Sequence, residues 1–233
     1  MGLGRAGRFH LASIKNLDSI ELKYVVDPGL STQDDIVQNN DFILLENIEE
    51  ALADDELDAA IISPPTQYHF ECVTRFLKAG KHVFTEKPLG KSLAEIQTCF
   101  DLSAEREKAL FLGFQRRYDR NFRALKSKIA TLEPVKIIKT SSRDNPQPSL
   151  DYLKISGNIF HDMLIHDFDM LIFLLGNEPP TSIFAYGHAY DEDIRNIPDL
   201  DTVMVILKYK TGLICSIDTS RNAIYGYDQR LEI

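Results

Sequence analysis

The sequence predicts an α/β protein in which a parallel, doubly wound domain is followed by an α+β domain with an open, mostly antiparallel sheet. Three observations predict this fold. Short apolar runs alternate with helical patterns in the first half, strands joined by short turns follow Pro134, and a glycine-rich motif opens the chain. Parallel strands need crossover helices, whereas short turns join antiparallel strands. We assign residues 1–115 to the first domain and residues 116–233 to the second.

The first domain is expected to hold five strands, separated by helices with their own start and stop signals. Asn47 precedes an acidic turn that suits a helix N-terminus, and Thr66 opens a helical pattern that stops at Gly80. Ser92 with Glu95 forms a capping box at the start of the next helix. The expected strands cover residues 20–26, 42–45, 59–62, 82–85 and 110–113.

The second domain is expected to combine one long helix with strands joined by short turns. The helical pattern covers residues 158–175 and is closed by Gly176, and the proline-rich residues 145–148 form a loop. Residues 230–233 look like the beginning of a further strand. The other expected strands cover residues 135–143, 182–189, 203–209 and 213–219.

Composition and charge narrow the class of protein. The 233 residues are 44% hydrophobic and 26% charged, with a net charge of −9. A nucleic-acid partner is not expected, because it would require clustered Lys and Arg on one face. A membrane span is not expected either, because no apolar run approaches the ~20 residues that cross a bilayer. The three scattered cysteines fit a reducing compartment better than a disulfide framework. We therefore expect a soluble, cytoplasmic protein.

Residues 2–7, with the sequence GLGRAG, form a complete G-x-G-x-x-G, the phosphate-binding motif of a Rossmann dinucleotide domain. Asp27 ends the second expected strand, where a carboxylate would bond a ribose 2′-hydroxyl. A carboxylate there repels a 2′-phosphate, so NAD is expected and NADP is disfavoured. The alternative interpretation is a flexible glycine-rich start.

The glycine motif should follow a strand, yet only Met1 precedes it. That first strand lies in the middle of the usual 3-2-1-4-5-6 order. Without it, its two neighbours would lie about 9–10 Å apart, twice the normal ~4.8 Å spacing, with unpaired backbone groups between them. We therefore expect a Rossmann domain that lacks its first strand.

Two further segments carry candidate acid–base residues. Lys87, between Glu86 and Pro88, follows an expected parallel strand, at the sheet edge where ligands bind, although a surface turn is equally compatible. In the second domain Asp162 and His166 are four residues apart and share a helix face. The carboxylate can orient the imidazole and stabilise its charged form, whereas a solvated or structural pair is the alternative. No metal site is expected, because no third ligand completes one.

Four segments together resemble the family of glucose–fructose oxidoreductase and inositol 2-dehydrogenase, the Gfo/Idh/MocA family. They are residues 2–7 (GLGRAG), 63–69 (SPPTQYH), 85–89 (TEKPL) and 113–119 (GFQRRYD). Residues 156–170 and 223–230 are most similar to inositol dehydrogenases. The resemblance implies a Rossmann domain, a second domain whose open sheet covers the active site, and a cis peptide bond before Pro88.

The resemblance also implies roles for individual residues. His166 would take the substrate hydroxyl proton, Asp162 would hold the ring, and Lys87 would assist the developing alkoxide while a hydride passes to the nicotinamide. The substrate would be a polyol or sugar, with myo-inositol as the first guess. Besides Lys87, it would be contacted by Arg116, Asp169 and Tyr227. The NAD cofactor would be bound by Gly2, Gly4, Arg5, Ala6, Gly7, Asp27, Ser63, Pro64, Thr66, His69, Glu86 and Lys87.

The chain also differs from the family pattern. Asn158 stands where many members have glycine, and members continue beyond residue 233, so we expect the second domain to be incomplete. An open sheet face that must be covered suggests a homo-oligomer. Two alternatives remain: a non-catalytic dinucleotide- or sugar-binding protein on the same fold, and a fragment that neither binds cofactor nor turns over.

Overall fold

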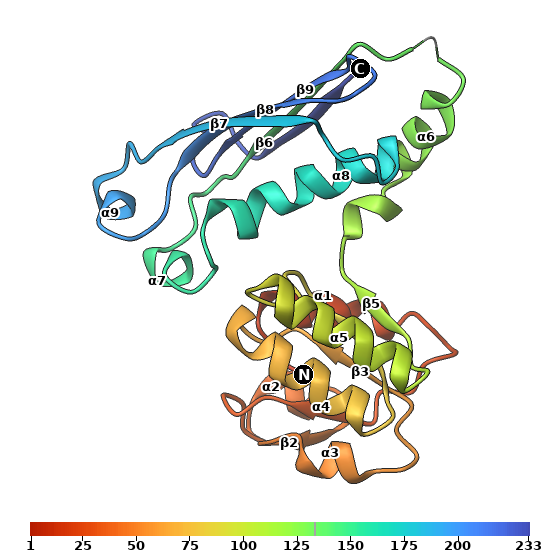
Figure 1. Cartoon of the computed structure of the whole chain (residues 1–233). Helices are drawn as coiled ribbons and strands as arrows, with labels where there is room; N and C mark the ends of the chain where they lie inside the picture. The colour runs from red at the N-terminus through yellow and green to blue at the C-terminus, as the bar shows by residue number, and fades with distance from the viewer. Residues whose placement is uncertain (133) are drawn as a thin grey trace. The chain divides into compact units, whose positions relative to one another are not determined.

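The computed structural model describes residues 1–132 and 134–233, which divide into two compact units. Met1–Gly113 forms the first unit and Phe114–Ile233 the second (Figure 1). Each unit has its own hydrophobic core. Among the residues described, no helix is both long enough and apolar enough to cross a membrane.

The first unit is an open parallel α/β structure, as the alternating pattern predicts. One sheet pairs β1 with β2, and the other has the order β3-β4-β5, all in parallel. The strands are β1 (Tyr24–Val26), β2 (Ile43–Leu45), β3 (Ala59–Ile62), β4 (His82–Thr85) and β5 (Leu110–Leu112). The helices are α1 (Arg5–Ile14), α2 (Asp35–Gln38), α3 (Glu49–Ala53), the short 3-10 helix η1 (Thr66–Tyr68), α4 (His69–Lys78) and α5 (Leu93–Glu105).

The first residues of the chain connect the two parallel sheets. The Met1 amino group donates to the Ile61 carbonyl at 2.7 Å, and the Ser63 amide donates to the Met1 carbonyl at 2.9 Å. On the other side, the Gly2 amide donates to the Val26 carbonyl at 2.9 Å. The sheets are separate, as expected without a strand between them. The prediction of unpaired backbone groups was wrong at their C-terminal ends, because residues 1–3 pair with both.

Most local helix signals act as the sequence predicts. The Glu95 amide donates to Ser92 Oγ at 3.2 Å, and Gly80 ends α4 with a φ of +72°. Thr66 opens a 3-10 turn, and the α-helix itself starts at His69. The strand expected from residue 20 begins only at Tyr24. The chain is still turned before it, since the Ile20 amide donates to the Leu17 carbonyl at 3.1 Å.

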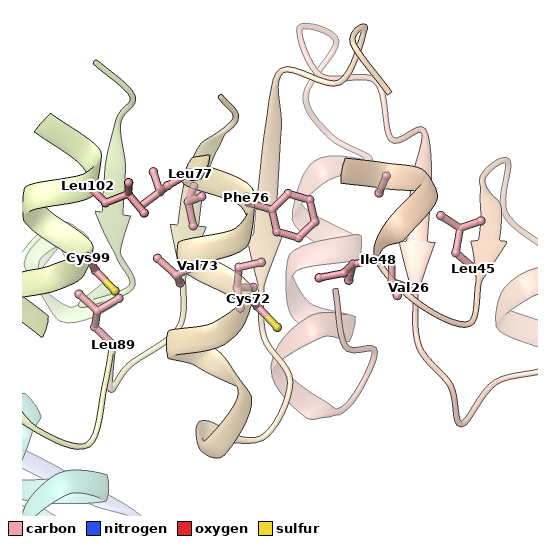
Figure 2. Packing of buried hydrophobic residues seen from close by; sticks show 13 residues of the cluster. Val26, Leu45, Ile48, Cys72, Val73, Phe76, Leu77, Leu89, Cys99 and Leu102 are labelled. Atoms are coloured by element: carbon pink, nitrogen blue, oxygen red, sulfur yellow. The ribbon is translucent and has the colours of Figure 1, made fainter. Parts of the chain in front are cut away.

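The core of the first unit gathers around α4. Val73, Phe76 and Leu77 are 0%, 2% and 0% exposed. Burying side chains of this size stabilises the fold by about 1.5–3 kcal/mol each. Figure 2 shows this helix between Cys99 and Leu102 on one side and Val26, Leu45 and Ile48 on the other. The packing fixes the ends of β1 and β3, which the first residues of the chain contact, and the end of β4, which Lys87 follows.

The second unit is built on one five-stranded sheet with the order β10-β6-β9-β8-β7. β6 and β9 are parallel and the other pairs are antiparallel, as an open, mostly antiparallel sheet requires. The strands are β6 (Ile137–Arg143), β7 (Ser182–His188), β8 (Thr202–Lys208), β9 (Ile214–Ser220) and β10 (Asp228–Glu232). The helices are η2 (Gln115–Tyr118), α6 (Arg120–Ile129), α7 (Leu150–Leu153), η3 (Phe160–Leu164), α8 (Ile165–Leu175) and α9 (Glu192–Arg195).

One face of this sheet packs against α8 and the other is open. Val203, Val205 and Leu207 of β8 are buried in the core with Leu171 of α8, whereas the alternate residues of β8 point to the other face. Figure 1 shows α8 running along the sheet. The strand at the end of the chain, predicted from residues 230–233, is β10, which pairs with β6.

The long helix predicted from residue 158 has two parts. Phe160–Leu164 forms a π-helical turn, and the α-helix runs from Ile165 to Leu175 and ends at Gly176. Asn158 precedes it with a φ of +123°, in a region that favours glycine. Its side-chain oxygen accepts hydrogen bonds from the amides of Phe160 at 3.0 Å and His161 at 3.2 Å. A strained residue therefore caps the helix that carries the acid–base pair.

Candidate active site

The three glycines of the motif have different surroundings. A Cβ at Gly7 would lie 1.9 Å from the Gly2 carbonyl oxygen, and a Cβ at Gly2 would lie 2.7 Å from the Pro64 nitrogen. Gly4 is open: among the described residues, apart from its chain neighbours, no heavy atom lies within 4 Å of an ideal Cβ there. Gly2 and Gly7 therefore close the loop tightly, and Gly4 leaves its backbone accessible.

The loop ends in the N-terminus of α1, with Gly4 at the N-cap and Arg5 and Ala6 in the first turn. Glycine has no side chain to cap the first amides, so these donors can serve a bound anion. The space over Gly4 and the helix N-terminus fit a pyrophosphate, which the motif requires close to the backbone. The residues present therefore fit a dinucleotide cofactor.

Asp27 holds the glycine loop from the end of β1. One of its carboxylate oxygens accepts a hydrogen bond from the Leu3 amide at 2.7 Å, and the other accepts from the Gly29 amide at 2.9 Å. Asp27 is half-buried. The residue predicted to select the ribose is also a structural anchor for the loop, a function that the motif alone did not indicate.

The loop after β3 lies against the glycine loop. Ser63 Oγ lies 3.0 Å from the carbonyl oxygens of both Met1 and Gly2, and Pro64 packs where Gly2 has no Cβ. Thr66 starts the short helix η1. Ser63 and Pro64, which follow β3, thus contact the glycine loop and limit its shape.

His69 connects the loop after β3 to residues 86–88, the loop after β4 that contains Lys87 and is called the lysine loop below. It is 2% exposed, and its Nδ1 lies 2.7 Å from the Pro88 carbonyl oxygen while its Nε2 lies 2.8 Å from the Pro64 carbonyl oxygen. With both ring nitrogens engaged by backbone, the side chain holds two loops together. The Lys87–Pro88 bond is cis, as the resemblance implies.

Glu86 has a partner on α1 that the sequence did not reveal. His10 Nε2 lies 2.8 Å from Glu86 Oε1, and the His10 ring packs edge-on to Phe84 with 5.0 Å between centroids. The lysine loop is thereby tied to the helix that follows the glycine motif. Lys87 itself is half-buried.

In the second unit, the acid–base candidates lie on the helix formed by η3 and α8. Asp162 and His166 are each 8% exposed. The phenol of Tyr152 donates to one oxygen of Asp162 at 2.8 Å, and Arg221 donates to the other at 3.0 Å. The His166 ring packs edge-on to Phe114, with centroids 6.2 Å apart. Tyr152 and Arg221 are separated from Asp162 by 10 and 59 positions, and no local pattern marks them.

Two arginines after β5 are paired with carboxylates on α8. Arg117 contacts both oxygens of Asp169, with a shortest distance of 2.6 Å, and Arg116 donates to Asp167 at 3.1 Å. Ser142 also donates to Asp167, at 2.8 Å. Burial raises the pKa of Asp167, and the adjacent guanidinium of Arg116 opposes that shift. Arg116 and Asp169, both predicted to bind substrate, therefore each have a protein partner.

Tyr227 lies in the loop before β10, next to Gly226, whose φ is +117°. It is 62% exposed, and its hydroxyl lies 3.5 Å from Gln229 Oε1. It is the most exposed of the predicted substrate-binding residues in this unit.

The two units match two parts of one protein family. Residues 1–114 match the family described as an oxidoreductase family with an NAD-binding Rossmann fold, and residues 131–233 match the Gfo/Idh/MocA C-terminal domain.

Curated relatives agree with this match. The chain is 38% identical to the myo-inositol 2-dehydrogenase of Thermotoga maritima and 35% identical to the inositol 2-dehydrogenase of Rhizobium meliloti. In both cases all of this chain aligns with 71% of the relative. Among solved structures, a myo-inositol dehydrogenase from Corynebacterium glutamicum is 31% identical with a TM-score of 0.89, over 99% of this chain and 69% of that one. The chain therefore belongs to the Gfo/Idh/MocA family of NAD-binding oxidoreductases.

Proposed function

We propose that this protein oxidises a secondary hydroxyl of a cyclitol with NAD, with myo-inositol as the first candidate and related cyclitols or aldoses after it. The observation that carries the proposal is the buried Asp162–His166 pair on one helix, where two donors fix the Asp162 carboxylate. The inositol dehydrogenases among the relatives support the choice of substrate.

NAD, when bound, supplies the hydride acceptor, and the chain's own residues handle the proton. The neutral imidazole of His166 takes the proton of the substrate hydroxyl, and Asp162 favours the imidazolium that results. The Lys87 ammonium stabilises the developing alkoxide. Arg116, Asp169 and Tyr227 orient the ring hydroxyls, and the guanidinium that already contacts Asp169 fixes its carboxylate in one geometry.

The glycine loop and Asp27 are the basis for proposing NAD over NADP. Gly4 leaves its backbone open to the pyrophosphate, and Asp27 lies half-buried at the end of β1. A 2′-phosphate beside that carboxylate would meet a like charge, whereas a 2′-hydroxyl can donate to it. Ser63, Pro64, Thr66, His69 and Glu86 shape the adjoining loops in this proposal.

The test is NADH formation by the purified protein with myo-inositol, together with one matched pair of variants. His166→Gln should lower kcat by about 10²–10⁴-fold, the typical contribution of a general base, and leave NADH affinity within about threefold. His82→Gln, which changes an exposed histidine at the first residue of β4, the end of that strand remote from Lys87, should leave both unchanged. NADH binding without turnover on any cyclitol or aldose would favour the non-catalytic binding protein. Equal loss of turnover and NADH affinity in His166→Gln would remove its role as the base.

We also propose a homo-oligomer formed through the open face of the second sheet. By register, one face of β7, β8 and β9 carries five large apolar side chains that are 46% to 73% exposed, far more than the scattered apolar residues of an ordinary surface. They are Phe184, Tyr186, Met204, Ile206 and Ile214.

The charge on this face favours a second copy of the chain as the partner. The chain carries a net charge of −9, but the charged residues of this face nearly balance, with four basic and three acidic side chains. Two identical faces can therefore meet without the like-charge repulsion expected elsewhere on the surface. The seven residues are Lys139, Arg143, Lys208, Arg230, Asp218, Asp228 and Glu232.

A further inference from the structure

Among the described residues, Arg221 is the largest fully buried side chain, with 0% exposure. Each of its three side-chain nitrogens has a partner. Nη1 donates to Asp162 at 3.0 Å, Nη2 to Asp199 at 2.8 Å, and Nε to the Leu200 carbonyl at 3.3 Å. One guanidinium therefore bridges two carboxylates from different segments, a geometry that the planar fork of arginine allows and the point charge of lysine does not.

Asp199 is fixed on its other side. Its Oδ1 accepts from the Ile159 amide at 2.7 Å and from the Leu200 amide at 2.8 Å. The Ile159 amide lies just before η3, so Asp199 binds the start of the helix on which Asp162 and His166 lie. The Arg221 guanidinium therefore contacts this helix in two ways: directly through Asp162, and through Asp199, which binds the Ile159 amide at the helix start.

Asp162 is fixed by a second donor besides Arg221. Tyr152 donates to Asp162 Oδ1 at 2.8 Å. Burial and the nearby Asp162 carboxylate raise the pKa of the Tyr152 phenol, so the phenol stays protonated and continues to donate. The two oxygens of Asp162 thus accept from donors on two different segments, which leaves the carboxylate little freedom to rotate.

Two buried carboxylates share one guanidinium in this cluster, one helical turn from His166. Two further acidic residues border it: the Arg221 amide donates to the backbone carbonyl of Asp201 at 2.8 Å, and the charge of Asp144 acts on Tyr152. Burying an ion pair is expensive, and well-packed apolar residues often serve stability as well. Carboxylates held in this position favour a positive charge that forms beside them.

We propose that Arg221 is a positioning residue for the acid–base pair: it bridges Asp162 to Asp199 and fixes the orientation of the Asp162 carboxylate one turn from His166. The expected effect of Arg221 on turnover rests on the proposed function. The bridge itself belongs to the resting protein and can be tested without substrate.

The first test compares Arg221→Gln and Arg221→Lys in the purified protein, with Arg195→Gln as the control. Arg195 lies in the same unit and donates only to the Ala189 and Tyr190 carbonyls in the contacts described. We expect kcat to fall on the order of 10- to 100-fold in both Arg221 variants, because a misplaced catalytic group costs that much. KM and NADH affinity should change less than about threefold, since neither depends on the carboxylate's orientation. The control should match wild type.

The pH profile separates positioning from mere stability. Without the guanidinium, Asp162 takes up a proton at a higher pH, or His166 beside an uncompensated carboxylate does so. Either event moves the acid limb of the kcat/KM profile to higher pH in Arg221→Gln. Arg221→Lys keeps a positive charge and should shift that limb less. A lowered melting temperature with unchanged kcat and acid limb would show a purely structural arginine and overturn the proposal.

A second readout does not need turnover. The ¹³C resonance of the Asp162 carboxyl, assigned by its loss in Asp162→Asn, should titrate at higher pH in Arg221→Gln than in wild type. Tyr152→Phe removes the other hydrogen-bond donor to Asp162 and should shift the Asp162 titration in the same direction by a smaller amount. If Arg221→Gln does not fold, Tyr152→Phe provides the test. An unchanged titration in the folded variants would contradict the inference even if the protein turns over cyclitols. A shifted titration in a protein that oxidises no cyclitol would uphold the bridge and reject the proposed function.

Discussion

Gly4 and Gly7 are three residues apart in one motif, yet their surroundings differ. Around Gly4 the described chain leaves open space, whereas a Cβ at Gly7 would lie 1.9 Å from the Gly2 carbonyl oxygen. A backbone oxygen cannot move aside as a flexible side chain can, so Gly7 is required by the fold. The fold does not require glycine at position 4, whereas the close approach of a bound pyrophosphate would require it.

Alanine at these two positions should therefore separate binding from folding. Gly4→Ala should keep the melting temperature of wild type and lower NADH affinity at least tenfold, because the methyl group occupies the space for the pyrophosphate. Gly7→Ala should lower the free energy of unfolding by more than about 3 kcal/mol, a value that signals a specific clash. Thermal unfolding and calorimetric titration with NADH measure the two effects. Wild-type NADH affinity in Gly4→Ala would mean that the pyrophosphate does not approach this backbone.

The sequence indicates the role of a single residue where that residue belongs to a local motif. Spacing alone singled out the glycine motif and Asp27, whereas Lys87 gained its catalytic role only from the resemblance, and the roles of all these residues stay predictions. Arg221 was not predictable, because its contact with Asp162 spans 59 positions. His69 was named as a cofactor ligand from the resemblance, but its contacts with the Pro64 and Pro88 carbonyls depend on two loops that only the fold brings together.

At the scale of elements, periodicity predicted the strands and the helices α4, α5 and α8, but it did not predict α6 (Arg120–Ile129), and the ends of elements were predicted less well. β3 and β4 have the predicted bounds, because each short strand is flanked by clear turn signals. The π-helical turn at Phe160–Leu164 was not predicted, since a single wider turn leaves the apolar pattern almost unchanged. Asn158, which stands where many family members have glycine, has a positive φ, and its side chain caps this turn.

The cap and the strain at Asn158 oppose each other, so two substitutions should differ. Asn158→Gly loses a cap worth about 1 kcal/mol but relieves backbone strain of similar size, and should keep a stability close to that of wild type. Asn158→Ala loses the cap and keeps the strain, and should lower the free energy of unfolding by about 1 kcal/mol. Urea unfolding measures both. Equal destabilisation by glycine and alanine would show that the strain is negligible.

At the scale of the whole molecule, each unit has its own core and its own set of candidate residues. The glycine loop, Asp27 and Lys87 lie on the first unit, and Asp162, His166 and the paired arginines lie on the second. The change of periodicity predicted this division, because parallel α/β and antiparallel patterns differ over long segments. The open face of the second sheet was predicted only in general terms, and the strand register identifies its residues.

The proposed homo-oligomer makes a test at this scale possible. Ile206→Lys places a charge within the apolar face of the second sheet and should shift the protein towards monomers, weakening association at least tenfold. Ile172→Lys is the matched control, since Ile172 is also 46% exposed but lies on α8. Light scattering after size-exclusion chromatography measures the mass of both. A monomeric wild type, or an Ile206→Lys protein that stays oligomeric, would contradict the proposed interface.

The central claim is that this chain transfers a hydride from a hydroxyl-bearing carbon to NAD. The most direct measurement incubates the protein with NAD and myo-inositol that carries deuterium on its ring carbons, and analyses the NADH by mass spectrometry. The account predicts one deuterium in each NADH formed, and loss of that signal in His166→Gln. NADH formed without deuterium, or NAD bound with no NADH formed from any cyclitol or aldose, would contradict it.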